Sequence, residues 1–569
     1  MALTMTILQT PAKDLTYKMY PVYNGLPFIV STNNYQRVNF KYIADIIIGT
    51  TKVSTLKQNK DISTSNYGVF DIGRIAENFI KSASPTFTNT GFGSDSKAYQ
   101  SYQVKFGAEY ERYMNFQSIV ASGPYSKLQF TTTGQQPDVR VNDMVIISNS
   151  NNTWYNGASK VIAVTTNSIT IDKAFDTNAT GTMTEAEQFY DNVSDSVDTK
   201  FISFLIPITR PTRINVGDTI VITQFTGAKY LGYDGEWLVT RTYNRLYNGL
   251  NYTAIATNCP VIADTPTNGG SIYAINKYVY TGITTSTIEY AFDGALQYAD
   301  LKNWNPTAYT MATSTKGKFL TNAPITQYIR LDEDAKLTSF NTSIMGSTKI
   351  AKGVFKTYNS SDTLLATYSH TLIGTPLTTA MIIAGVGTKN LLTISSTALT
   401  STVSYYTYEL QTAQSLRVSE IRKYIIDREC FRYTQKRFKW KNRMGGWDYF
   451  TFNLRSDRTV EIERSNYRKA LNTVTSNKYG YSVGNRGNTT YNVNAKDSEI
   501  VFSNWLSNDE ATWLEELFTS PDVYLLDGTN ELPIILNDTV LKIGEKENIG
   551  LISYSINYEY AFNKVIQRG

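Results

Sequence analysis

Hydrophobic and polar residues alternate in two runs between residues 430 and 454. In the first run, Phe438 and Trp440 alternate with the cations Arg437, Lys439 and Lys441. Because successive side chains of a strand point to opposite faces, this spacing predicts a strand with one apolar and one cationic face. Gly445 and Gly446 follow and favour a turn, since glycine accepts backbone angles that other residues avoid. A second alternating run after the turn completes a predicted β-hairpin.

One face of this hairpin combines cations with large aromatic rings. The residues on it are Arg437, Lys439, Lys441, Trp447 and Tyr449. Trp and Arg often anchor protein interfaces, so we predict that these five side chains contact a neighbouring subunit.

Two alternatives remain open for the same face. It can be a solvated sheet surface, if a third strand follows in a meander and its Glu461 and Glu463 pair with the cations. It can also bind nucleic acid, because Lys and Arg outnumber acids over residues 417–443, and cations beside aromatics suit phosphates and bases.

Short alternating segments separated by turn residues recur along most of the chain, which predicts a mainly β fold. A pattern of strand, long loop, Tyr-Asn-Gly or Tyr-Asp-Gly turn and paired strands occurs twice, at residues 140–172 and 213–255. Asn-Gly and Asp-Gly favour tight turns, and a short strand order of this sort closes into a small barrel. We therefore predict multidomain β-sandwiches with two small inserted β-barrels and a few short helices.

The same patterns predict four regions, in line with roughly 150 residues per domain. Residues 1–125 and 266–320 form an N-terminal β-domain, interrupted by an insertion of the two barrel modules at 126–265. Residues 321–411 form a β-sandwich. Residues 412–569 form a C-terminal β-rich domain with one amphipathic helix.

The clearest helix signal lies near the C-terminus. Ser507 and Glu510 have the spacing of a capping box, and an apolar stripe follows at Trp513, Leu514 and Leu517. The final alternating run, residues 551–562, predicts a central strand of a sheet.

Composition narrows the function classes. The chain has 569 residues, of which 41% are hydrophobic, 13% aromatic and only 18% charged, and its net charge of +5 is too slight to indicate a nucleic-acid protein. Two distant cysteines predict no disulfide framework. We also expect neither a signal peptide nor membrane insertion, since no apolar run approaches about 18 residues.

The chemistry-bearing residues predict a protein that is not an enzyme. His370 is the single histidine and lies in an alternating strand, so we predict a structural role for it and no metal site. Phosphate-binding, dinucleotide and C-x-x-C motifs are absent from the sequence. We accordingly expect no catalytic residues and no cofactor, although a pair of catalytic carboxylates is not excluded by sequence.

Several segments carry a resemblance to a known group of proteins. They are Phe319-Leu-Thr-Asn-Ala-Pro324 leading to Ile329-Arg-Leu-Asp332, the turn and strand Gly445-Gly446-Trp-Asp-Tyr-Phe450, and the C-terminal residues Trp513, Ser520-Pro521 and Tyr558-Glu-Tyr560. In these patches, which together sample most of the chain, the sequence resembles virion structural proteins of tailed phages of Bacteroidota, including the crAss-like group. The two small barrels also resemble modules inserted into phage tail proteins.

The resemblance implies a β-rich tail subunit, such as a ring, hub or baseplate component, that is assembled in the host cytoplasm. Its implied partners are further copies in a closed ring, of roughly 6- or 12-fold symmetry, and other tail or portal-proximal proteins, with transient passage of genomic DNA. Two other classes stay open: a glycan-binding phage adhesin or depolymerase, and a nucleic-acid-binding virion protein.

Overall fold

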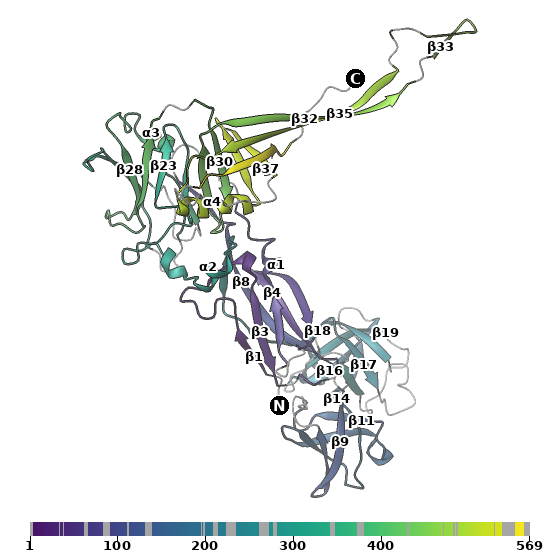
Figure 1. Cartoon of the computed structure of the whole chain (residues 1–569). Coiled ribbons are helices and arrows are strands. Elements are labelled where there is room, and N and C mark those ends of the chain that lie inside the picture. Colours follow the sequence, from purple (N-terminus) through teal and green to yellow (C-terminus); the bar gives the residue numbers. More distant parts are fainter. Residues whose placement is uncertain are drawn as a thin grey trace. The chain divides into compact units, whose positions relative to one another are not determined.

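The computed structural model of the chain is shown in Figure 1. It describes residues 4–562 with gaps at 34, 38, 62–65, 83–91, 111–112, 131–138, 190, 195, 197–199, 209–213, 215, 224–234, 261–271, 277–280, 342–347, 372–380, 430–431, 470–471, 482–483, 485–486, 529 and 538–551. The chain forms two compact units, each built from three segments.

The first unit comprises Met1–Lys13, Gly25–Ile75 and Ser101–Glu289. Its first part is a three-stranded sheet of β1 (Met5–Gln9), β3 (Pro27–Thr32) and β6 (Gly68–Asp71). A second sheet contains β4 (Lys41–Ile48), β5 (Thr51–Gln58), β8 (Tyr99–Glu109) and β21 (Thr281–Thr285). The short helix α1 (Gly73–Ala76) follows β6, and the Asp71 carboxylate accepts the Gly73 amide at its start.

The first copy of the sequence repeat lies in a closed six-stranded barrel. Its strands are β9 (Tyr113–Ser122), β10 (Tyr125–Phe130), β11 (Met144–Ser148), β12 (Gly157–Val164), β13 (Ser168–Ile171) and β14 (Gly181–Phe189). The barrel closes because β11 pairs with both β12 and β14. The expected turn is present after the 3-10 helix η2 (Thr153–Tyr155), where Gly157 has a φ of +108°.

The second copy forms a half-barrel. Its strands are β15 (Asp191–Ser194), β16 (Phe201–Pro207), β17 (Thr219–Thr223), β18 (Gly235–Tyr247), β19 (Leu250–Pro260) and β20 (Ile272–Asn276). Its Tyr-Asp-Gly turn begins at Tyr233 and Asp234, which lie outside the described residues. The predicted fold class is confirmed as a mainly β, multi-sheet chain with two small barrel modules, of which the first closes and the second does not.

The second unit comprises Asp14–Asn24, Ala76–Gln100 and Tyr290–Gly569. A five-stranded sheet runs in the order β23 (Thr326–Arg330), β29 (Arg422–Asp427), β28 (Tyr405–Gln411), β25 (Lys352–Tyr358) and β26 (Leu364–Thr371). A three-stranded sheet contains β24 (Lys336–Phe340), β27 (Met381–Gly385) and β7 (Phe92–Asp95), and helix α3 (Thr388–Ile394) follows β27. Short elements complete this part: β2 (Met19–Pro21), η1 (Val22–Asn24), β22 (Glu289–Phe292), α2 (Tyr298–Lys302) and η4 (Pro306–Tyr309).

These pairings divide the chain differently from the four regions expected from sequence. Strand β7 was placed in the N-terminal region but pairs with β27, and β29 was placed in the C-terminal region but pairs with β28. The alternation of apolar and polar residues indicates which side chains of a strand face inward. It does not indicate which strand pairs with it, because that depends on contacts between segments distant in sequence.

The C-terminal part of the second unit is a seven-stranded sheet. Its order is β31 (Trp447–Phe452), β30 (Lys436–Lys441), β36 (Val523–Asp527), β37 (Asn530–Leu536), β38 (Ser555–Tyr560), β35 (Asn488–Phe502) and β32 (Ser456–Arg468). Helix α4 (Asn508–Thr519) begins with the predicted capping box of Ser507 and Glu510. Strand β38 lies between β37 and β35, as expected for a central strand.

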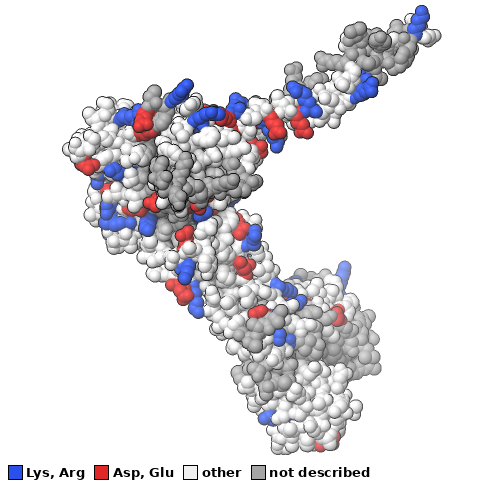
Figure 2. Space-filling model, in the orientation of Figure 1, with Lys and Arg blue, Asp and Glu red and all other residues white. Residues whose placement is uncertain are grey.

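Strands β32 and β35 continue beyond the sheet as a two-stranded ribbon (Figure 1). Only Ser498–Phe502 of β35 pairs with β38, whereas the β32–β35 pairing runs on through Val460 to Arg468. Near the ribbon's far end, β33 (Asn472–Thr475) pairs with β34 (Lys478–Tyr481). The meander on which the solvated alternative depends is therefore not formed, because β31 and β32 lie at opposite edges of the sheet. Figure 2 shows side chains of both charges along the ribbon.

Within the part of the chain that the structure describes, no helix has the length and apolar character needed to cross a membrane.

Candidate functional site

The predicted hairpin lies between two hydrophobic cores of the second unit, and both of its faces are buried. Phe438 and Trp440 pack with α4 residues, including Trp513, in one core. Trp447 and Tyr449 pack in the other core, which also contains the buried tyrosines of β28. Strand β30 is flanked by β31 and β36, so it has no free edge. The alternation predicted from sequence is confirmed, but the second face is an interior one.

The five residues predicted to form a subunit contact are all covered by the chain itself. Lys439 is fully buried, Lys441, Trp447 and Tyr449 are buried, and the Arg437 side chain is 12% exposed. The expectation of an exposed contact face is therefore corrected. The physical reason is that the three-stranded and five-stranded sheets contribute a second apolar layer, which packs over this face.

The cations on this face have partners within the chain. Lys439 Nζ lies 2.7 Å from Glu531, Arg437 lies 2.9 Å from Glu333, and Lys441 forms an ion pair with Asp293. Burial lowers the pKa of Lys439, and the hydrogen bond that Lys439 donates to the Glu531 carboxylate opposes that shift. Glu461 and Glu463, expected as partners in the solvated alternative, lie instead on the exposed ribbon.

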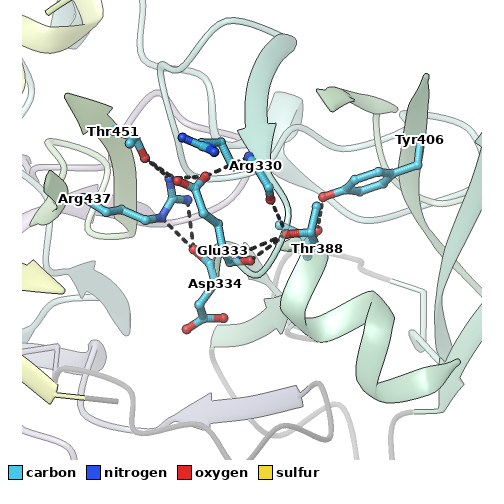
Figure 3. Close-up of polar contacts among 8 residues, drawn as sticks. Arg330, Glu333, Asp334, Thr388, Tyr406, Arg437 and Thr451 are labelled. Carbon is cyan, nitrogen blue, oxygen red and sulfur yellow. Dashed lines mark hydrogen bonds and ion pairs between the residues drawn. The ribbon is translucent and has the colours of Figure 1, made fainter. Parts of the chain in front are cut away.

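Arg437 joins the hairpin to the loop after β23 (Figure 3). Its guanidinium donates to the Glu333 carboxylate, to Thr451 Oγ1 at 2.7 Å and to the Asp334 carbonyl at 2.8 Å. Thr451 in turn donates to Glu333 at 2.7 Å. The Glu333 amide donates to Thr388 Oγ1 at the first residue of α3. This closed set of hydrogen bonds fixes the relative positions of β30, β31 and α3.

Two buried carboxylates lie on the other side of the hairpin. Asp448 accepts hydrogen bonds from Trp513 Nε1 at 2.7 Å and Thr321 Oγ1 at 2.8 Å. Glu516 accepts from Asn322 at 2.7 Å and from the Arg443 amide at 3.1 Å. Burial, reinforced by Asp448, raises the pKa of Glu516 to about 7, and burial also raises the pKa of Asp448. Both carboxyl groups are thus more readily protonated in the folded chain than in water.

We expect the stability of the second unit to fall as the pH rises from about 4.5 to 7. A carboxyl group whose pKa is raised by folding binds more protons in the folded state than in the unfolded state. The stability that it contributes is therefore fully present below its unfolded pKa of 4.5. That stability is lost as the pH rises through its folded pKa of about 7. For Glu516 the expected loss in the free energy of unfolding is about 3 kcal/mol. Glu516→Gln should therefore flatten the pH dependence of the thermal midpoint over this window.

The control is Glu515→Gln on the same helix, which should leave the pH profile of the parent in place. A profile for Glu516→Gln that matches the parent would contradict the assignment of this titration to Glu516.

A cleft of about 650 Å³ opens beside the hairpin, within the second unit. Its lining comes mainly from four parts of the chain: β23, the end of β29 with the residues after it, the second half of β31, and residues 504–506 before α4. Tyr328 and Trp505 line the cleft and are 69% and 51% exposed. Tyr449 and Asn453 also line it, and their Oη and Oδ1 atoms are buried without a protein hydrogen-bond partner.

The sequence alone does not predict this cleft. Its pattern marks Tyr449 and Arg437 but not Tyr328, Asn453 or Trp505. Tyr328 offered a signal, because it occupies the solvent side of an alternating strand where a polar residue is expected. The distance between these residues in sequence hid their proximity, since β23 and β31 belong to different sheets.

His370 occupies the position expected of a structural histidine. It is buried, its Nε2 lies 2.9 Å from Tyr408 Oη, and burial lowers its pKa to about 4. Among the described residues, no group of three or more His, Cys, Asp or Glu side chains is arranged to hold a metal ion.

Comparison with known proteins gives no family. No protein-family model and no curated protein matches the chain. Solved structures that align with it include the plexin A4 extracellular region, at 8% identity, covering 86% of this chain and 42% of that one, and the phage phi92 endosialidase, at 10% identity, covering 95% and 89%. The TM-score is 0.12 in both cases, too low to indicate a shared fold, and the chain spans about two fifths of the plexin chain.

Proposed function

We propose that this chain is a structural subunit of the tail of a tailed bacteriophage, which assembles with neighbouring copies through the β32–β35 ribbon. The role is architectural rather than catalytic, and the place of assembly is the host cytoplasm. Support comes from the resemblance noted in the sequence, from the multi-sheet architecture and above all from the ribbon.

The ribbon is the main support for the proposal, because a two-stranded ribbon has little stability on its own. Two-stranded hairpins are marginally stable in water, and a third strand or a packed layer is needed for stability. Among the described residues, β32 and β35 pair only with each other beyond the sheet, and most of their side chains there are exposed. Such a ribbon gains stability by lying on another surface.

The two faces of the ribbon differ in polarity. Val460 lies opposite Asp497, and Ile462 lies opposite Ala495, so one face carries three apolar side chains where it leaves the sheet, next to the ion pair between Arg458 and Asp497. Val460 and Ile462 are 41% and 49% exposed. Glu461 and Glu463 occupy the other face, opposite Lys496 and Asn494. An apolar face of this kind suits burial against a partner, with the charged face left toward solvent.

A neighbouring copy is the partner that fits a tail subunit. In a closed ring, the ribbon of each copy lies on the next copy, and each copy is contacted by the ribbon of the copy before it. Every apolar ribbon face is then covered. We propose a closed ring of roughly 6- or 12-fold symmetry that also contacts other tail or portal-proximal proteins.

Removing the ribbon tests this assembly role. Thr459 pairs with Ser498, so an Asn-Gly pair can replace residues 460–497 and close the hairpin with a two-residue turn. We expect the shortened chain to melt like the parent, because β32 keeps its pairing inside the sheet, and to be missing from particles. The measurements are thermal unfolding of the purified chain and quantitative mass spectrometry of particles produced with it.

A milder variant, Val460→Thr with Ile462→Thr, keeps the ribbon and removes only its apolar face. It should weaken incorporation, whereas Glu461→Gln with Glu463→Gln on the opposite face should not. Electron microscopy of the particle should show several copies around one axis, each ribbon on the next copy. A single copy per particle, or full incorporation of the shortened chain, would contradict the proposal.

A further inference from the structure

The cleft beside the hairpin has features of a small-molecule site that the assembly role does not use. Its volume of about 650 Å³ lies within the range of 300–1,000 Å³ typical of ligand sites. Three of its lining residues, Arg437, Glu333 and Thr451, are hydrogen-bonded to one another, so this part of its shape is set before any ligand arrives.

Two exposed aromatic side chains line the cleft. Tyr328 belongs to β23 and Trp505 to the segment before α4, and each exposes at least half of its surface. Such rings present a flat apolar face together with a polar tip. A ligand that matches them has apolar patches on flat rings and hydroxyl groups at its edges, as a pyranose has.

The lining also includes polar groups that lack a partner in the protein. Tyr449 is buried, and its hydroxyl can donate or accept a hydrogen bond, while the Asn453 carbonyl accepts one. Burial raises the pKa of Tyr449 well above its usual value, so the hydroxyl stays protonated. Leaving such groups unpaired costs about 1–3 kcal/mol each, which a hydroxyl-bearing ligand would recover.

The charges in the cleft disfavour an anionic ligand. Arg437 is paired with Glu333, and Arg428 donates to the carbonyls of Thr400 and Val403. A third arginine, Arg330, also lines the cleft, together with four carboxylates: Glu333, Asp427, Glu429 and Glu510. With four acids against three arginines, a phosphate or nucleic-acid backbone would meet a slight excess of negative charge.

We infer that this cleft binds a neutral oligosaccharide, which stacks on Tyr328 and Trp505 and forms hydrogen bonds with Tyr449 and Asn453. The site is separate from the ribbon, so binding of sugar and assembly are independent properties of the chain.

The test uses the full-length chain on a microarray of neutral gluco-, galacto-, manno- and N-acetylglucosamine oligomers, together with heparin fragments as polyanions. The neutral oligomer with the strongest signal is then titrated in solution by calorimetry. We expect Trp505→Ala to weaken binding at least tenfold, because half of the stacking surface is lost. Tyr298→Ala and Trp154→Ala remove exposed aromatics outside the cleft and should bind like the parent.

Tyr449→Phe separates binding from structure. Its hydroxyl has no protein partner, so the change should leave the thermal midpoint unchanged or higher, yet weaken sugar binding severalfold. The inference is overturned if no neutral oligomer binds, if only heparin binds with steep salt dependence, or if Trp505→Ala and Tyr449→Phe bind like the parent. It is also overturned if a protein segment of the assembled particle occupies the cleft.

Discussion

Lys441→Met is expected to destabilise the second unit by about 3–5 kcal/mol, because it leaves Asp293 as an unpaired buried charge. Lys441 is 7% exposed and Asp293 is 1% exposed, and the two form an ion pair. Asp293 also accepts a hydrogen bond from the Ser82 amide. Methionine matches the length of lysine, so the loss reflects the charge rather than a cavity.

The measurement is the denaturant midpoint of the second unit, followed by the fluorescence of its buried tryptophans. Lys496→Met is the control, because its pair with Glu559 spans 3.9 Å and the lysine is 59% exposed. An exposed pair of this kind contributes well under about 1 kcal/mol.

A second change identifies the cause. Adding Asp293→Asn to Lys441→Met removes the orphaned charge and keeps an acceptor for the Ser82 amide, so part of the lost stability should return. A Lys441→Met chain as stable as the parent would show that this pair is not buried as described.

The local features of the hairpin could be predicted from sequence because they depend on neighbouring residues. Alternation placed Phe438 and Trp440 on one face and Trp447 and Tyr449 on the other, and each pair packs in its own core. The turn at Gly445 has a φ of +80°, and a Cβ there would lie 2.4 Å from the Asp293 carbonyl oxygen. The helix cap at Ser507 follows the same logic, since a capping box is complete within four residues.

The partners of the hairpin could not be predicted, because they come from far along the chain. Glu333 is 104 residues from Arg437, and Asp293 is 148 residues from Lys441. A cation on an alternating strand is expected at the surface unless a second layer of the fold covers it. The residues near the cation in sequence do not indicate whether such a layer is present. The length of the ribbon could not be predicted from sequence either. Val460 and Ile462 alternate with polar residues just as the residues of a half-buried strand do.

The double change Arg437→Ala with Trp447→Ala follows from this correction. If the two residues formed only a subunit contact, the isolated chain would melt like the parent and fail only in assembly. In the structure both lie inside the chain, so we expect it to unfold instead. Loss of a buried Trp costs about 3–5 kcal/mol, and loss of Arg437 leaves Glu333 without its cation, at about 1–3 kcal/mol.

The two losses should nearly add, because Arg437 lies opposite Thr451 whereas Trp447 lies opposite Lys441, at the other end of the strand pair. Their sum is comparable with the whole stability of an ordinary domain, about 5–15 kcal/mol. The matched control, Arg455→Ala with Trp505→Ala, removes an exposed arginine and an exposed tryptophan from the same unit and should hardly shift its unfolding midpoint. If the Arg437 and Trp447 variant instead keeps its midpoint and loses only assembly, the cationic face of the hairpin is open in solution and is a contact between subunits.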